Sequence, residues 1–242
     1  MSNEAKKNVV AAPYPADRAA TLGRSGAVPG HASRLADASA FLRGFLSRPF
    51  EVASLVPSSV FLEDRVVQAG DLAQASCVVE LGPGTGGTTR ALLRALSPQA
   101  RLLAIEVNSG FCSRLRRLIH DPRLAVQNGS AESLTDALRR RGLPAADVMI
   151  SGVPFSTLPC ALAQRIAAAM HANLAPGGRL VAYQCRADVV GYFAPHLGPP
   201  RVAWEWRSLP PMRVFVWVKP AVGGATQGPP LADAAQHPRE LI

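Results

Sequence analysis

A glycine-rich turn between two apolar segments, within residues 78–90, constrains the fold of this chain more than any other feature. A short β-branched run ends in Glu80, a loop follows that contains Gly82, Gly84 and Gly86, and a helical pattern begins directly after the loop. This order of strand, tight loop and helix is the first unit of a βαβ fold. Glycine has no Cβ, so the loop can adopt positive φ angles and let a ligand lie on its N–H groups, towards which the helix directs its positive end.

The glycine spacing allows three interpretations. The pattern Gly82-x-Gly84-x-x-Gly87 matches the dinucleotide-binding fingerprint, which alone is a weak signal. The pattern that starts at Glu80 and continues through Gly82, Gly84 and Gly86 also matches the nucleoside loop of S-adenosylmethionine-dependent methyltransferases. The third interpretation is a plain tight turn with no ligand.

A second acid favours a nucleoside site. Glu106 ends the apolar strand pattern 101–105 and lies 20 residues past Gly86, where a ribose-binding carboxylate is expected. A carboxylate at this position can accept hydrogen bonds from both ribose hydroxyls. We therefore predict that the loop and Glu106 bind an adenosyl group.

Length and composition agree with one α/β domain. The chain has 242 residues, of which 48% are hydrophobic and 18% charged. No apolar run approaches the ~18 residues that span a bilayer, and Lys6 and Lys7 are not followed by the apolar stretch of a secretory signal. The four cysteines have no CxxC spacing, so we expect reduced thiols of a cytoplasmic protein and no metal ligands.

The net charge of +9 and the isoelectric point of about 10.2 favour anionic lipid or nucleic acid as a partner. The arginines are densest in two patches, one of Arg114, Arg116, Arg117 and Arg123, the other at 139–141. Each patch, taken singly, is also compatible with a solvated helix face.

The ends of the chain differ from its centre. Residues 1–37 and 220–242 are rich in Ala, Pro and Gly, and we expect them to be disordered or loosely attached. Residues 38–48 form the pattern of a short basic amphipathic helix with two phenylalanines on one face, stopped by Pro49. Such a helix can lie in a lipid interface or pack on the domain's own core. Ser58 and Ser59 can cap a following helix over 60–72.

The rest of the chain alternates between strand and helix patterns. Strands are predicted at 124–127, 146–150 and 179–184, helices at 111–120, 131–140 and 162–174, and an antiparallel hairpin from 202–206 and 214–219. The loop 151–159 follows the fourth strand. Loops at the carboxyl ends of parallel strands carry the site in open α/β sheets, so this loop should face the cofactor.

Taken together, these stretches resemble the bacterial phospholipid N-methyltransferases, relatives of the rRNA adenine dimethylases among class I methyltransferases. The similarity spans about residues 38–219, and its stretches are 41–49, 56–59, 79–86, 151–155, 174–178 and the closing hairpin. The resemblance implies a Rossmann-like α/β fold, with a mainly parallel seven-stranded sheet, helices on both faces and a C-terminal antiparallel hairpin. It also implies an enzyme that uses S-adenosylmethionine to methylate the amine of phosphatidylethanolamine-type lipids, bound peripherally to the inner face of the membrane.

The resemblance also implies site residues. In the acceptor loop these are Ser151, Gly152, Pro154 and Phe155. Around the cofactor they are Glu80, Gly82, Gly84, Gly86, Glu106, Ser130, Glu132 and Ser58. Phe155 could offer a cation–π face to the amine or pack in the core. The family's usual Gly-Asp-Ala after the third strand is Gly129-Ser130-Ala131 here, so Ser130 or Glu132 would replace the aspartate that accepts from the adenine amino group.

Several rival functions remain open at this point. The chain could methylate RNA at adenine N6 or a small amine, although Ser151 stands where adenine dimethylases have asparagine and no room is left for their extra helical domain. It could also be a non-catalytic basic protein that binds membrane or nucleic acid on the same fold. A dinucleotide oxidoreductase is disfavoured, because no pattern supplies a hydride-transfer site.

Overall fold

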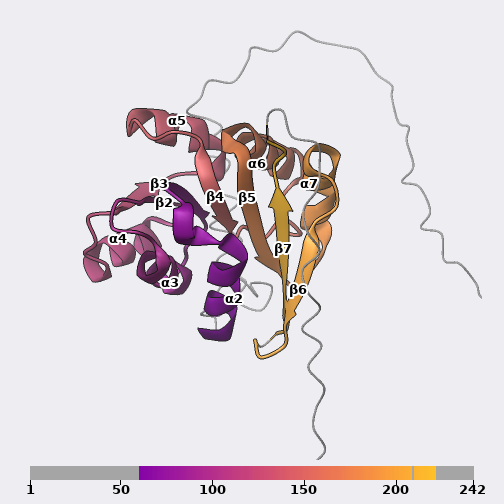
Figure 1. Ribbon diagram of the computed structural model, residues 1–242, viewed down its shortest axis with the longest axis horizontal. Helices are drawn as coiled ribbons and strands as arrows, with labels where there is room; N and C mark the ends of the chain where they lie inside the picture. Colours follow the sequence, from indigo (N-terminus) through magenta and orange to yellow (C-terminus); the bar gives the residue numbers. More distant parts are fainter. Residues whose placement is uncertain (1–59, 209, 222–242) are drawn as a thin grey trace, which may run out of the picture.

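The computed structural model describes residues 60–208 and 210–221, which form a seven-stranded sheet flanked by helices (Figure 1). The strands are β1 Cys77–Leu81, β2 Arg101–Glu106, β3 Leu124–Asn128, β4 Ala146–Ser151, β5 Leu174–Gln184, β6 Arg201–Glu205 and β7 Met212–Val218. The helices are α2 Val60–Gly70, α3 Gly87–Ala95, α4 Ser109–Leu118, α5 Leu134–Arg140, α6 Cys160–Asn173 and α7 Asp188–Leu197, with 3-10 turns η2 Leu72–Gln74 and η3 Ala131–Ser133.

The strand order across the sheet is β3-β2-β1-β4-β5-β7-β6. The first five strands of that order are parallel, and β7 is antiparallel to both of its neighbours. The predicted parallel sheet and its closing antiparallel hairpin are therefore confirmed.

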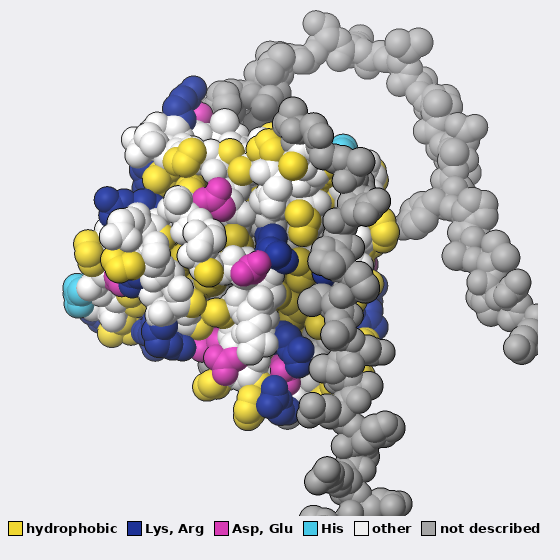
Figure 2. All heavy atoms as spheres, in the orientation of Figure 1, with side chains coloured by type: hydrophobic (Ala, Val, Ile, Leu, Met, Phe, Trp, Pro, Cys, Tyr) yellow, Lys and Arg dark blue, Asp and Glu magenta, His cyan; other side chains and the backbone are white. Residues whose placement is uncertain are grey.

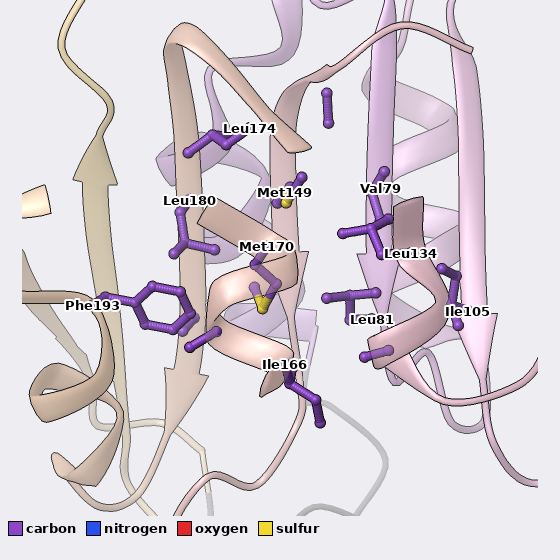
Figure 3. Packing of buried hydrophobic residues seen from close by; sticks show 14 of the residues in the cluster. Val79, Leu81, Ile105, Leu134, Met149, Ile166, Met170, Leu174, Leu180 and Phe193 are labelled. Carbon is purple, nitrogen blue, oxygen red and sulfur yellow. The ribbon is translucent and has the colours of Figure 1, made fainter. Parts of the chain in front are cut away.

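Two buried clusters hold the helices on opposite faces of the sheet. Every residue of β1 is buried, as expected for a central parallel strand covered on both sides. One cluster joins the sheet to α5, α6 and α7, and Figure 3 shows Met170 of α6 lying near Met149 and Leu180 of the sheet. The other cluster joins the sheet to α2 and α3 through residues such as Val66 and Leu92.

The strand register brings four loops to one edge of the sheet. Leu81 at the end of β1 pairs with Ile105 of β2 and with Ser151 of β4. Glu106 at the end of β2 pairs with Asn128 at the end of β3. The loops after β1, β2, β3 and β4 therefore leave the same carboxyl edge, which is where ligands bind in open α/β sheets.

The structure differs from the sequence prediction in two elements. The helix α6 ends at Asn173 and β5 already starts at Leu174. The predicted turn around Gly177 is included in this longer strand, and Gly177 N donates to the O atom of Lys219, the residue after β7, at 2.8 Å. The helix α7 was not predicted, since it contains Gly191 and Pro195, which both act as helix breakers in a sequence pattern.

Several predictions lie outside the described residues. They are the loose segment 1–37, the predicted tail 220–242 except for its first two residues, the amphipathic helix 38–48, the capping serines Ser58 and Ser59, and the cofactor-binding role of Ser58. None of the helices in the described part of the chain has the length and hydropathy of a membrane span.

Candidate functional site

The glycine loop after β1 is built for close contact with a ligand. Gly82, Gly84 and Gly86 have φ angles of +75°, +54° and +86°, a conformation that residues with a Cβ rarely adopt. A Cβ at Gly84 would meet no atom within 4 Å, so the space above it is open, whereas a Cβ at Gly86 would lie 2.5 Å from Leu115 Cδ2. The helix α3 begins at Gly87 and directs its N-terminus into the same space.

Glu106 joins this loop to the next strand. Its Oε2 accepts from Gly84 N at 3.0 Å and its Oε1 from Asn108 N at 2.8 Å. The side chain is 6% exposed, and burial raises its pKa while the backbone hydrogen bonds act in the opposite direction. A carboxylate has about four lone-pair sites, so both oxygens can still accept from a ligand's hydroxyls.

The end of β3 holds the residues expected near an adenine. Ser130 caps η3 and donates to Glu132 Oε2 at 3.2 Å, and Glu132 also forms an ion pair with Arg165 of α6. Asn128 Nδ2 donates to Glu106 O at 3.0 Å and so fixes this turn against the end of β2. Both predicted acceptors, Ser130 and Glu132, therefore lie on the same turn and are engaged with each other.

Glu80 lies underneath the glycine loop. The side chain is 0% exposed, and its Oε2 accepts from Thr89 Oγ1 of α3 at 2.6 Å. Its Oε1 has no hydrogen-bond partner among the described residues. Burial raises the pKa of Glu80 to about 8, and Glu106 and Glu63 act in the same direction. In this structure Glu80 supports the loop from below, and Glu106 is the acid that reaches the loop backbone.

The raised pKa of Glu80 gives a pH dependence of stability. Between the ordinary value of 4.5 and about 8 the folded protein binds a proton that the unfolded chain has released, so stability falls as pH rises through this window. Without added cofactor, we expect the unfolding midpoint to fall from pH 5 to pH 8, and Glu80→Gln to remove much of that fall. Calorimetry at several pH values measures it, with the exposed Asp136→Asn as the control. An unchanged pH slope in Glu80→Gln would contradict the assignment.

The loop after β4 sits directly on the glycine loop. Gly152 N donates to Leu81 O at 2.9 Å, and Gln184 Nε2 of β5 donates to Val153 O at 2.8 Å. A Cβ at Gly152 would lie 2.5 Å from Tyr183 Oη and 3.1 Å from Gly82 O. Gly152 is therefore required for the close approach of the two loops.

Two predicted acceptor-loop residues turn inwards. Phe155 is 1% exposed and packs in the core, with its ring centroid 5.4 Å from that of Tyr192 and 5.6 Å from that of Phe193. Of the two alternatives for Phe155, the structure supports core packing and not a face presented to an amine. Ser151 is 0% exposed, and its Oγ accepts from Val153 N at 3.3 Å, so it shapes the loop from inside. Pro154 is partly exposed in the same loop.

The sequence did not predict three residues that lie at the border of the site, Tyr183, Gln184 and Glu63. Tyr183 and Gln184 end β5 as Glu106 ends β2, so polar residues closing an apolar strand were the available signal. Burial, with the nearby Glu80 carboxylate, raises the pKa of Tyr183. Glu63 of α2 lies against Gly87 at the start of α3, and burial raises its pKa as well. No sequence signal pointed to Glu63, because its contact depends on how α2 packs.

Comparison with known proteins identifies the class. A family model described as a methyltransferase domain matches residues 78–178. The N-methyltransferase NodS from Bradyrhizobium japonicum, solved with S-adenosyl-L-homocysteine, superposes with a TM-score of 0.52 at 17% identity, covering 67% of this chain and 89% of NodS. The O-methyltransferase TomG from Streptomyces achromogenes, solved with S-adenosylmethionine, gives 0.52 at 19% identity, covering 76% of this chain and 89% of TomG. At these identities the likeness shows the fold.

Two relatives in sequence are more specific. The chain is 33% identical over 139 residues to the ornithine lipid N-methyltransferase of Singulisphaera acidiphila, covering 57% of this chain and 72% of that protein. It is 34% identical over 94 residues to ribosomal RNA small subunit methyltransferase A of Parasynechococcus marenigrum, covering 38% of this chain but only 30% of that protein.

Fold, site and comparisons together define a class I methyltransferase that uses S-adenosylmethionine as its cofactor. Within that class, the chain belongs to the bacterial phospholipid N-methyltransferase family, which is related to the rRNA adenine dimethylases. The described residues fit the cofactor, because the open space over Gly84 borders a carboxylate that can accept from ribose hydroxyls.

Proposed function

We propose that this enzyme methylates the amine of phosphatidylethanolamine-type phospholipids at a membrane surface. The observation that carries the proposal is the seating of the loop 151–155 on the glycine loop, with Gly152 N bonded to Leu81 O at 2.9 Å. An amine held by this loop would lie beside the cofactor. The relation to an ornithine lipid N-methyltransferase supports an amine carried by a lipid over one in RNA.

The residues of the chain bind and orient the reactants. S-adenosylmethionine supplies an electrophilic methyl group on its sulfonium. Glu106 would accept from the ribose hydroxyls, and the turn of Ser130 and Glu132 would border the adenine. Gly152 lets the acceptor loop pack closely on the glycine loop. Gln184 holds the acceptor loop in place through Val153 O. Such positioning can supply most of the rate enhancement when two bound reactants are aligned. The ammonium proton would pass to water, and a carbonyl of the loop would accept a hydrogen bond from the amine.

A labelled-methyl assay tests the proposal. The full chain is given S-adenosylmethionine with a labelled methyl group and vesicles that contain phosphatidylethanolamine, followed by lipid extraction. We expect label in the lipid fraction. Ornithine-lipid vesicles form a second arm, because the relative of that name makes this lipid the second candidate acceptor. Label in RNA or in a soluble amine, with none in either lipid, would overturn the proposal.

We also propose that residues 38–48 help to hold the enzyme on the membrane, because their pattern is that of a basic amphipathic helix. The double variant Phe41→Glu, Phe45→Glu should sediment with anionic vesicles at least about tenfold more weakly, since burial of two aromatic side chains is lost. The control is Leu118→Glu, an exposed apolar residue of α4. Equal sedimentation of the double variant and the full chain would exclude this role for the helix.

A further inference from the structure

Aromatic, aliphatic and basic side chains surround the end of the β6–β7 hairpin, and all but the half-buried Trp204 and Arg213 are exposed. We call it the hairpin-tip patch, and it comprises Val60, Phe61, Trp204, Trp206, Arg207 and Arg213. Trp206 is 67% exposed, Val60 65% and Phe61 44%. Large exposed apolar patches are rare on monomeric soluble proteins and mark interaction sites.

Ring contacts order the patch in two groups, one of Trp204, Trp206 and Arg213 and one of Phe61 and Arg207. Trp204 and Trp206 stack with ring centroids 4.5 Å apart and an interplanar angle of 8°. The Arg213 guanidinium carbon lies 4.4 Å from the Trp204 ring centroid, and that of Arg207 lies 4.1 Å from the ring centroid of Phe61 in α2. Met212 and Val214, which flank Arg213, pack in the cluster under α2, so Arg213 and its neighbour Trp204 face away from α2. Phe61 and Arg207 lie on the α2 side, and the tip therefore carries aromatic rings and guanidinium groups on both faces.

The patch lies at the edge of the sheet that carries the site. Since β5 and β6 are both antiparallel to β7, they run in the same direction, and the hairpin turn projects from the carboxyl edge. Arg213 pairs in register with Gln184, whose amide holds Val153 of the acceptor loop. Figure 1 places the hairpin end and the start of α2 together, and Figure 2 shows hydrophobic and basic side chains there with acidic ones among them.

The two arginine patches predicted from the sequence are less suited to bind a membrane at the carboxyl edge of the sheet. The crossover helix α5 runs back from the carboxyl edge, so residues 139–141 at its end lie towards the opposite edge of the sheet (Figure 1). Arg123 is committed to the fold, because it pairs with Asp121 at 2.7 Å and donates to Leu93 O at 2.8 Å.

The low net charge around the tip favours a lipid surface over a nucleic acid as the partner of the patch. Glu205 is 1% exposed and pairs with Arg207 at 2.9 Å and with Arg65 at 3.5 Å. The nearby charge of Asp64 also helps to raise the pKa of Arg207. Three arginines and two acids leave a single net positive charge around the tip. Nucleic acid binding draws on several uncompensated cations, whereas tryptophan and arginine beside aliphatic groups suit the headgroup region of a bilayer.

We propose that the hairpin-tip patch inserts into the headgroup region of a phospholipid bilayer and sets the carboxyl edge of the sheet against the membrane. Trp206, Phe61 and Val60 enter the interface, and Arg207 and Arg213 meet lipid phosphates. This orientation brings the acceptor loop next to the bilayer. The inference rests on the proposed lipid substrate for its purpose, but docking itself can be measured without the reaction.

Tryptophan fluorescence of the full chain reports on the patch directly. The chain has three tryptophans, and Trp217 is 1% exposed, so Trp204 and Trp206 carry the environmental response. The vesicles contain phosphatidylcholine and phosphatidylglycerol with bromine high on the acyl chain, and no amine lipid. We expect a shift of the emission to shorter wavelength and quenching by the brominated lipid.

Matched variants separate the patch from other membrane contacts. Phe61→Ala, Trp206→Ala should weaken vesicle partitioning about tenfold or more, because two interfacial aromatic side chains are removed. The control Leu118→Ala, Val218→Ala removes two side chains that are 45% and 50% exposed outside the patch, and it should stay within about twofold of the full chain. Methyl transfer to a short-chain, monomeric acceptor lipid should be unchanged in the patch variant.

The outcomes are distinct. Docking without any methylation of either lipid would support the patch and overturn the proposed substrate. Methylation of the short-chain lipid with no bromine quenching would overturn the patch and keep the substrate. Tryptophans of the free protein that are shielded from aqueous iodide, by residues 1–59 or by a second copy of the chain, would also overturn docking. So would a patch variant that loses RNA binding and keeps vesicle binding.

Discussion

Glu106→Gln is expected to weaken binding of S-adenosylmethionine by roughly 100-fold while leaving the fold intact. Both carboxylate oxygens accept from backbone N–H groups, Oε2 from Gly84 and Oε1 from Asn108. A glutamine amide can place an oxygen against only one of them, and its NH₂ group then faces the other donor. A hydrogen bond to a charged group contributes about 1.5–3 kcal/mol, and the amide also loses acceptor capacity for the ribose.

Isothermal titration calorimetry with S-adenosylmethionine and with its demethylated product measures this loss. Asp136→Asn is the matched control, because it removes an exposed carboxylate on α5, away from the loop, and should bind both ligands as the unaltered chain does. A circular dichroism spectrum and an unfolding midpoint close to those of the unaltered chain are expected for both variants. Tight binding of either ligand by Glu106→Gln would remove Glu106 from the cofactor site.

The sequence predicted the strands, helices and loops that carry this site, because these elements depend on local sequence signals. The hydrophobic periodicity and the Gly and Pro residues between segments predicted the strands and most helices. Acidic residues at the ends of predicted strands indicated Glu80 and Glu106. The two acids look alike in sequence, yet Glu106 reaches the loop backbone at 3.0 Å while Glu80 is wholly buried beneath it. Which of two such acids faces the ligand depends on the pleat of each strand and on α3, and therefore on packing.

The parts that were missed depend on contacts between distant segments. Phe155 could have faced the site or the core, and the position of α7 decides this, because Tyr192 and Phe193 pack on its ring. The helix α7 itself was hidden by Gly191 and Pro195. The contact between Phe61 and Arg207 at the hairpin end forms only when α2 packs beside the hairpin, and these two residues lie far apart in sequence.

Gly152→Ala is expected to lower methyl transfer by 100-fold or more, with a smaller effect on cofactor binding. The new Cβ would stand 2.5 Å from Tyr183 Oη and 3.1 Å from Gly82 O, so the acceptor loop has to move away from the glycine loop. Tyr183 cannot yield easily, because its ring lies in the packed cluster under α2. A displacement of about 1 Å at a reacting centre can cost 100-fold in rate, since the amine and the methyl group no longer align.

Gly191→Ala is the matched control for this substitution. Gly191 lies in α7, where a Cβ would meet no atom within 4 Å, so the same chemical change there should leave activity unaltered and stabilise the helix by up to about 1 kcal/mol. Labelled-methyl transfer at saturating cofactor, with the cofactor affinity measured separately, distinguishes a displaced acceptor loop from a lost cofactor site. If Gly152→Ala folds and transfers methyl groups at the rate of Gly191→Ala, then the acceptor does not bind between these two loops, because a displaced loop could not align it with the methyl donor.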